Sequence, residues 1–189
     1  MVAGCGVVRA ETFESRGVTF YGFRVEPRGG ERLADGGWGL GTEGAWSPAR
    51  TPSLWLTVGA DGGNLDFDDS VTAAGIDPPV VLTASRDFLR LFAGADFWLR
   101  AARVRPHGGL HLALVRQDAR LLRFDPAFGE FESVESDSDT GLGYDASAGL
   151  AIQLGRSTRV DAGARYLRAP DLSGTDVLLL YVGVGFGSR

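Results

Sequence analysis

The clearest feature of the sequence is an alternation of apolar and polar side chains with a period of two residues rather than the 3.6 of a helix. Between residues 141 and 154, apolar side chains occupy the even positions from Leu142 to Leu154, and small or polar ones lie between them. Residues 88–100 repeat the pattern, with the apolar side chains at odd positions. Because consecutive strand side chains point to opposite faces, each segment is predicted to be a strand with one apolar and one mixed face.

Weaker versions of this pattern give eight predicted strands, near residues 18–26, 37–46, 53–61, 87–101, 109–118, 141–154, 158–168 and 176–186. Short connections alternate with long ones, and the long ones are expected at 27–36, 62–86, 119–140 and 169–175. Such alternation is typical of barrels with short periplasmic turns and long extracellular loops. The prediction is an all-β fold: an eight-stranded antiparallel up-and-down transmembrane β-barrel over residues 17–189, after a flexible N-terminal segment, residues 1–16.

The contents of the two faces decide which one points outward, because a soluble barrel also alternates but keeps its apolar face inside. The mixed face carries many glycines, which make room for bulky partners inside a narrow barrel. It also carries five arginines and four carboxylates, whose near balance is expected of buried charges that need partners. We therefore predict a lumen charge network of Arg24, Glu43, Arg90, Asp96, Arg100, Asp145, Arg159, Asp161 and Arg165, with the apolar face toward lipid.

Two further features bear on this orientation. Aromatic side chains on the expected apolar face resemble an interfacial girdle, namely Tyr21, Trp38, Trp46, Tyr144, Tyr166 and Phe186. In the fifth strand, the alternation that points Leu110, Leu112 and Leu114 outward also points Arg116 and Asp118 outward. Either this strand leaves the lipid early or a bulge shifts its register.

Composition excludes several classes of protein. The chain has 28 glycines, a hydrophobic fraction of 44% and a formal charge of -5, which indicates neither a disordered chain nor a basic nucleic-acid binder. The only cysteine, Cys5, rules out an intramolecular disulfide. No apolar run approaches the ~20 residues of a membrane helix, whereas a barrel strand needs only about ten.

Candidate chemistry is sparse. His107 is expected in a short turn, and His111 has Ala113 rather than a serine two residues on, so neither has a local nucleophile to activate. We expect His111 to be structural and hydrogen-bonded inside the barrel, and we predict no catalytic residue, metal site or cofactor. The long loops are acidic and offer a possible surface for ligands, with Asp61, Asp66, Asp68, Asp69 and Asp77 in one and Asp125, Glu130, Glu132, Glu135, Asp137 and Asp139 in another.

The strand number, the alternating loops and the closing strand from Asp176 to Phe186 resemble the small outer-membrane barrel superfamily, the OmpA, OmpX and OmpW-like proteins. In that family the last strand carries a glycine and a near-terminal aromatic, which Gly183 and Phe186 match, although Gly187, Ser188 and Arg189 follow here. The resemblance implies a location in the outer membrane of a Gram-negative bacterium. The expected partners are outer-membrane lipid and lipopolysaccharide, with no nucleic acid, and the expected state is a monomer.

Three functions remain open from the sequence. The favoured one is a structural, anchoring or surface-interaction role, with a salt-bridged and largely plugged lumen, because side chains usually fill so narrow a barrel. A narrow pore or small-solute transporter is the first alternative. The second is a soluble lipocalin-like ligand-binding barrel, which Gly36-Gly37-Trp38 resembles in its short G-x-W element, although here that element falls on the second strand.

Overall fold

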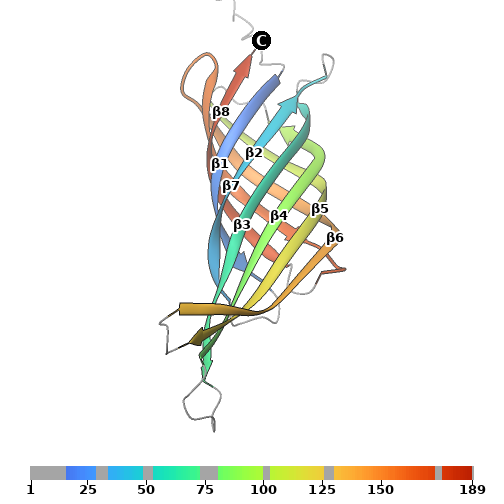
Figure 1. Cartoon of the computed structure of the whole chain (residues 1–189). Helices are drawn as coiled ribbons and strands as arrows, with labels where there is room; N and C mark the ends of the chain where they lie inside the picture. The colour runs from blue at the N-terminus through green and yellow to red at the C-terminus, as the bar shows by residue number, and fades with distance from the viewer. Residues whose placement is uncertain are drawn as a thin grey trace, which may run out of the picture.

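The computed structural model is a closed barrel in which each strand pairs with its neighbour along the chain and the first pairs with the last (Figure 1). It describes residues 16–28, 34–48, 53–72, 81–99, 103–125, 130–172 and 176–188. Side chains are described over these ranges except at 34–35, 65–72, 81–84, 121–125, 130–135 and 188. The expected N-terminal segment, residues 1–16, lies outside the described residues apart from Arg16, which begins the first strand.

All neighbouring strands are antiparallel, as predicted. They are β1 (Arg16–Pro27), β2 (Ala34–Trp46), β3 (Leu54–Thr72), β4 (Val81–Trp98), β5 (Val104–Asp125), β6 (Glu130–Gln153), β7 (Thr158–Arg168) and β8 (Val177–Ser188). The start of β1 pairs with the end of β8, at the same end of the barrel as the connections 47–53, 99–103 and 154–157. We call this the turn end and the opposite end, where the long hairpins lie, the loop end (Figure 1).

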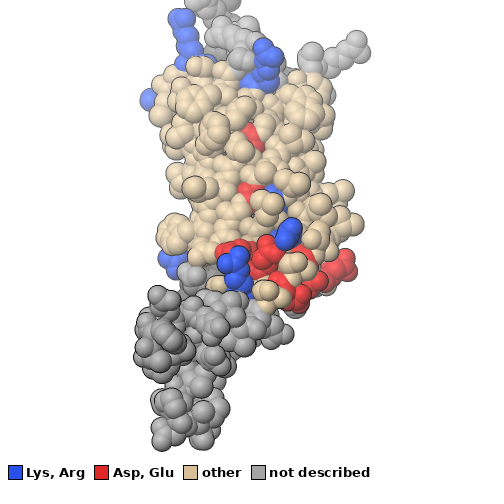
Figure 2. All heavy atoms as spheres, viewed as in Figure 1, with Lys and Arg blue, Asp and Glu red and all other residues tan. Residues whose placement is uncertain are grey.

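The barrel is apolar on the outside, as the sequence predicts. On β5, Leu110, Leu112 and Leu114 are 72%, 75% and 45% exposed, whereas Ala113 and Val115, which point to the other face, are 3% and 0% exposed. Figure 2 shows that the visible face of the barrel has a broad band with little charge, and that charged side chains gather toward both ends. Such a band matches the lipid-facing surface of a barrel that crosses a membrane. Within the described ranges, no helix has the length and apolar character needed to span a membrane.

The facing of β1 is opposite to the prediction. Tyr21 was expected outside and Arg24 inside, but Tyr21 is buried in the lumen and Arg24 lies on the outer face. β1 carries apolar side chains on both faces, with Phe20 outward and Phe23 inward, so its pattern does not decide between them. Tyr21 finds a hydrogen-bond partner inside for its hydroxyl, and Arg24 lies toward the loop end, where an outward charge is tolerated near the membrane surface.

Inward glycines provide the space that the bulky lumen side chains occupy. A Cβ at Gly39 on β2 would overlap the ring of Phe23, and one at Gly59 on β3 would overlap the ring of Phe92. A Cβ at Gly185 on β8 would collide with the Arg159 side chain. Each large side chain therefore lies across a glycine of another strand, which confirms the role predicted for these glycines.

The long hairpins are strands for most of their length, which corrects two predicted loops. β3 and β4 continue to pair as far as Thr72 and Val81, and β5 and β6 as far as Asp125 and Glu130. These four strands have 19, 18, 22 and 24 residues, about twice the ~9–11 that cross a bilayer. Beyond the membrane neither face needs to be apolar, so the two-residue alternation that marks a strand in the sequence is absent there.

The uncertainty in the fifth strand is settled by its register. β4 and β5 pair without a shift past Arg116 and Asp118, so no bulge lies at these two positions; the register of β5 shifts only later, against β6, between Leu121 and Leu122. The two side chains are exposed on the outer face and form an ion pair of 3.1 Å, so β5 leaves the lipid after Leu114. The expected outward aromatics are exposed except Tyr21; the exposed ones are Trp38, Trp46, Tyr144, Tyr166 and Phe186.

Candidate functional site

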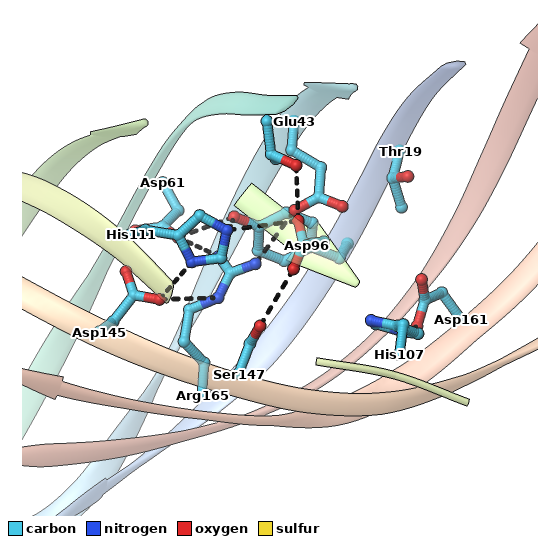
Figure 3. Close-up of polar contacts among 12 residues, drawn as sticks. Thr19, Glu43, Asp61, Asp96, His107, His111, Asp145, Ser147, Asp161 and Arg165 are labelled. Atoms are coloured by element: carbon cyan, nitrogen blue, oxygen red, sulfur yellow. Dashed lines mark hydrogen bonds and ion pairs between the residues drawn. The ribbon is translucent and has the colours of Figure 1, made fainter. Parts of the chain in front are cut away.

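The candidate site is the interior of the barrel, where polar and charged side chains from several strands point toward one another (Figure 3). Two of the residues expected there do not belong to the described interior: Arg24 lies on the outer face, and Arg100 lies outside the described residues. The others point inward from four strands, β2, β4, β6 and β7, namely Glu43, Arg90, Asp96, Asp145, Arg159, Asp161 and Arg165.

Arg90 is at the centre of the interior and has no exposed surface. Its Nε donates to Asp61 Oδ1 at 2.9 Å and its Nη2 donates to Asp61 Oδ2, which makes a bidentate pair. Its Nη1 donates to Asp145 Oδ2 at 2.8 Å. The guanidinium of β4 therefore joins β3 to β6 across the lumen through charge-assisted hydrogen bonds, the strong kind.

Asp61 is a member of this network that the sequence reasoning missed, because it was assigned to an acidic loop. Its side chain is fully buried, and it also accepts a hydrogen bond of 2.7 Å from the Tyr21 hydroxyl. A signal was present in the sequence. Asp61 is separated from Trp55 and Thr57 by an even number of residues, so it points to the same, inward face of β3. It also pairs directly with Arg90 of β4, so the correct pairing of β3 with β4 would have placed it in the network.

Arg165 reaches into the same group of carboxylates from β7. Its Nη2 donates to Glu43 Oε2 at 3.0 Å, and its Nη1 and Nε lie 3.8 Å from Asp61 and 3.6 Å from Asp145. Its guanidinium carbon is 4.6 Å from the centre of the Phe92 ring. The two arginines thus share Asp61 and Asp145, and removal of either arginine leaves buried carboxylates with fewer partners.

His111 links the network to Asp96. Its Nδ1 lies 2.7 Å from Asp145 Oδ1, and its Nε2 lies 3.3 Å from Asp96 Oδ2. Ionised carboxylates only accept hydrogen bonds, so both contacts are hydrogen bonds only when both ring nitrogens carry protons. Asp96 also accepts hydrogen bonds from Thr57 at 2.5 Å and Ser147 at 3.2 Å. The expectation that His111 is hydrogen-bonded inside the barrel agrees with this geometry.

A second polar group lies nearer the turn end. His107, expected in a turn, is on β5, and its Nε2 lies 2.9 Å from Asp161 Oδ1. Its ring stacks on Trp98 with ring centres 4.4 Å apart. The Arg159 guanidinium lies 5.2 Å from the centre of the same Trp98 ring and donates to Thr19 Oγ1 at 3.0 Å. Aromatic stacking and cation–π contacts therefore hold this end of the interior together.

The described interior contains charged side chains of both signs in contact with one another. The carboxylates are Glu43, Asp61, Asp96, Asp145 and Asp161, and the arginines and histidines paired with them or lying beside them include Arg90, Arg159, Arg165, His107 and His111. Such pairing is what makes buried charge tolerable in a closed interior.

Toward the loop end the interior is apolar, which the sequence did not indicate. We call this cluster the apolar plug: Tyr21, Phe23, Val25, Phe88, Phe92, Ala113, Val115, Leu167, Ala169, Leu172, Val177, Leu179 and Tyr181. Val25 and Val115 have no exposed surface. Leu172, from the segment after β7, lies against Gly141 of β6. The plug therefore fills the barrel between the charge network and the loop end.

The two histidines of the described interior contact carboxylates rather than hydroxyl groups. The ring nitrogens of His107 and His111 that make hydrogen bonds make them to carboxylates, and no described hydroxyl is hydrogen-bonded to either ring, as activation of a nucleophile would require. Over the described ranges, no three His, Cys, Asp or Glu side chains are grouped as metal ligands.

The chain matches no protein-family model, and no curated protein is similar to it in sequence. Solved structures do resemble it. OprG, an outer membrane protein from Pseudomonas aeruginosa, is 12% identical with a TM-score of 0.62, over 95% of this chain and 99% of that chain. Neisserial surface protein A is 14% identical with a TM-score of 0.59, over 92% and 97%.

A third similar structure is Ail, the attachment invasion locus protein of Yersinia pestis, in complex with the heparin analogue sucrose octasulfate. It is 19% identical with a TM-score of 0.57, over 93% of this chain and 99% of that chain. All three align over nearly their whole length, at identities that establish the fold and no more. Together with the apolar outer band and the closed antiparallel topology, these matches show that the chain has the fold of the small eight-stranded outer-membrane β-barrels.

Proposed function

We propose that this protein is a closed outer-membrane barrel that acts as an anchor and presents its long hairpins for surface interactions, rather than passing solutes. The observation that carries the proposal is the filling of the interior. Arg90 is fully buried among its carboxylates, and Val25 and Val115 of the apolar plug are fully buried beyond it. A water-filled path would leave such side chains partly exposed. The alternative of a narrow pore therefore has no support from the described interior.

The hairpins supply the surface for interaction. Residues 62–86 and 119–140 contain ten carboxylates and three arginines. Among the described side chains, Asp137 and Asp139 of β6 lie in a run, residues 136–140, in which every residue is exposed. The loop end is drawn at the bottom of Figure 2, where acidic side chains gather. A surface of this charge favours a cationic partner, because opposite charges steer association.

This expectation differs from the complex described for Ail, whose ligand is a sulfated heparin analogue. Sucrose octasulfate is strongly anionic, and the acidic hairpins of the present chain would repel it. We therefore propose that, if the two barrels share a role at the cell surface, they differ in the charge of the ligand they accept.

Electrical recording from the purified protein in planar lipid bilayers tests the closed barrel. We expect no steady channels. A double variant, Phe23→Ala with Phe88→Ala, removes two rings from the apolar plug and is expected to raise the conductance, provided that circular dichroism shows the β-structure intact. Steady open channels in the unaltered protein would contradict the proposal. Recovery of the protein in the aqueous phase without detergent would contradict the membrane location and favour a soluble barrel.

A further inference from the structure

The outer surface of the barrel contains an apolar groove of about 480 Å³ that the closed interior does not use. Its floor is formed by Gly22 of β1 and Gly39 of β2. One wall is formed by Trp38 and Leu40 of β2, and the other by Leu180 and Val182 of β8. These four wall side chains are 67%, 76%, 44% and 62% exposed in the order named.

The groove exists because Gly22 lies at an outward position between two residues with larger side chains. Gly22 pairs with Leu40 on one side and with Val182 on the other. A Cβ at Gly22 would make only ordinary contact, with Leu40 Cδ2 at 3.7 Å. No close packing therefore requires a glycine here, unlike the inward glycines, whose Cβ atoms would overlap other side chains. The missing side chain instead leaves a channel along β1.

A cation lies at the loop-end side of this channel. Arg24, two residues beyond Gly22 on the same outer face, pairs in register with Trp38 and Leu180. Its Nε donates to Glu26 at 2.5 Å, and its guanidinium carbon lies 5.7 Å from the centre of the Trp38 ring. The Arg24 side chain is itself about half exposed, at 48%. Arg28, also exposed, continues the same face, so this end of β1 carries two arginines and one carboxylate.

We infer that the groove binds one acyl chain of a phosphorylated glycolipid of the outer leaflet, with a lipid phosphate on the Arg24 guanidinium. The inference deepens the proposed membrane role and rests on the outer-membrane location. In a bilayer any acyl chain can fill an apolar channel, since there is little hydrophobic driving force between apolar surfaces in lipid. The headgroup must therefore provide the selection, and the planar fork of N–H donors of an exposed guanidinium matches a phosphate in a bidentate way.

The position of Arg24 along the barrel indicates which leaflet of the membrane contains the bound lipid. Arg24 lies toward the loop end, on the side of the barrel from which the hairpins extend (Figure 1). The acyl channel over Gly22 then runs from Arg24 toward the middle of the membrane. A lipid with its phosphate at Arg24 therefore belongs to the leaflet that faces the outside of the cell, which in this membrane holds the phosphorylated glycolipid lipopolysaccharide.

Native mass spectrometry of the detergent-solubilised protein, titrated with lipid A or with zwitterionic phosphatidylcholine, tests this inference. Gly22→Leu fills the channel, and Arg24→Gln removes the charge. The matched control is Gly44→Leu, at an outward glycine of β2 where a Cβ would meet no atom within 4 Å. We expect Gly22→Leu and Arg24→Gln each to weaken lipid A binding about tenfold, since hydrogen bonds to charged groups are the stronger ones, and Gly44→Leu to leave it unchanged.

Equal binding of lipid A and phosphatidylcholine by the unaltered protein would overturn the inference, as would an equal effect of the two leucine substitutions. Detergent partitioning and bilayer recordings on the same variants separate this failure from that of the proposed function. If the barrel enters membranes and stays closed but shows no preference for lipid A, only the glycolipid site is wrong. If it does not enter membranes, both proposals fail.

Discussion

Replacement of Arg90 by methionine removes the cation at the centre of the charge network while keeping a long apolar side chain in its place. Arg90 makes two hydrogen bonds to Asp61 and one to Asp145, and all three side chains are fully buried. The substitution leaves both carboxylates without their main partner. Loss of one member of a buried pair costs about 3–5 kcal/mol, so we expect Arg90→Met to lower the free energy of unfolding by about that amount.

Urea unfolding in lipid vesicles, followed by the fluorescence of the four tryptophans, measures this loss. The control is Arg116→Met, because Arg116 pairs with Asp118 at 3.1 Å but its side chain is 57% exposed. Exposed pairs contribute about 0–1 kcal/mol, and the control should lose no more than that.

A double-mutant cycle separates the ion pair from the loss of packing. Asp61→Leu combined with Arg90→Met removes both members of the bidentate pair, so the double variant should be more stable than the sum of the two single losses predicts. Coupling between groups in direct contact typically amounts to about 0.5–3 kcal/mol. A cost for Arg90→Met no larger than that of Arg116→Met, or strictly additive losses, would refute the reasoning.

Three other substitutions test the packing of the interior by the same unfolding measurement. Tyr21→Phe removes the hydroxyl that donates to Asp61 and should cost about 1–3 kcal/mol; no change would mean that this hydrogen bond is not formed. Leu172→Ala opens the apolar plug beside Gly141 and should cost about 2–5 kcal/mol, whereas a loss near zero would place Leu172 outside the plug. Gly41→Leu, whose Cβ would collide with the Tyr21 ring, should destabilise the barrel strongly, and tolerance of it would show that inward glycines are not needed for space.

The sequence is most informative where two faces of a strand meet two different environments. Along β6 between Gly141 and Gln153, the outward side chains face lipid and the inward ones meet the lumen, so the alternation is regular and its prediction correct. Where β6 extends beyond the membrane, every residue from 136 to 140 is exposed, so both faces of the strand meet water there. The alternation then carries no signal, and strands were predicted as loops.

Two failures within the membrane have a different cause. On β8 both faces are apolar near the loop end, because the interior there is the apolar plug: Leu179 points inward and Leu180 outward. On β1 the apolar side chains are divided between the two faces, with Phe20 outward and Phe23 inward. The expectation that a charged side chain points into the lumen then gave the wrong facing for Tyr21 and Arg24, because Arg24 lies on the outer face toward the loop end. The plug itself was not predicted, because an inward leucine and an outward one look the same in the sequence.

The charge network could be predicted only in part from the sequence. Its arginines could be assigned to the inward face of regular strands, but their partners depend on the register between strands. Asp61 meets Arg90 because β3 and β4 pair those two positions directly, whereas Arg165 meets Glu43 across the barrel with no pairing between β2 and β7. The second kind of contact depends on the closure of the barrel, which a single sequence does not specify residue by residue.

In a closed outer-membrane barrel, the outer face contacts lipid and the interior excludes water at the level of the apolar plug. Nuclear magnetic resonance of the protein in lipid nanodiscs tests both requirements at once, through magnetisation transfer to methyl groups from lipid acyl chains and from water. We predict that the methyl groups of Leu110 and Leu112 receive magnetisation from lipid, and that those of Val25 and Val115 receive it from neither. Transfer from water to Val115 would reveal an open channel, and transfer from water instead of lipid to Leu112 would show that the barrel is not in a membrane.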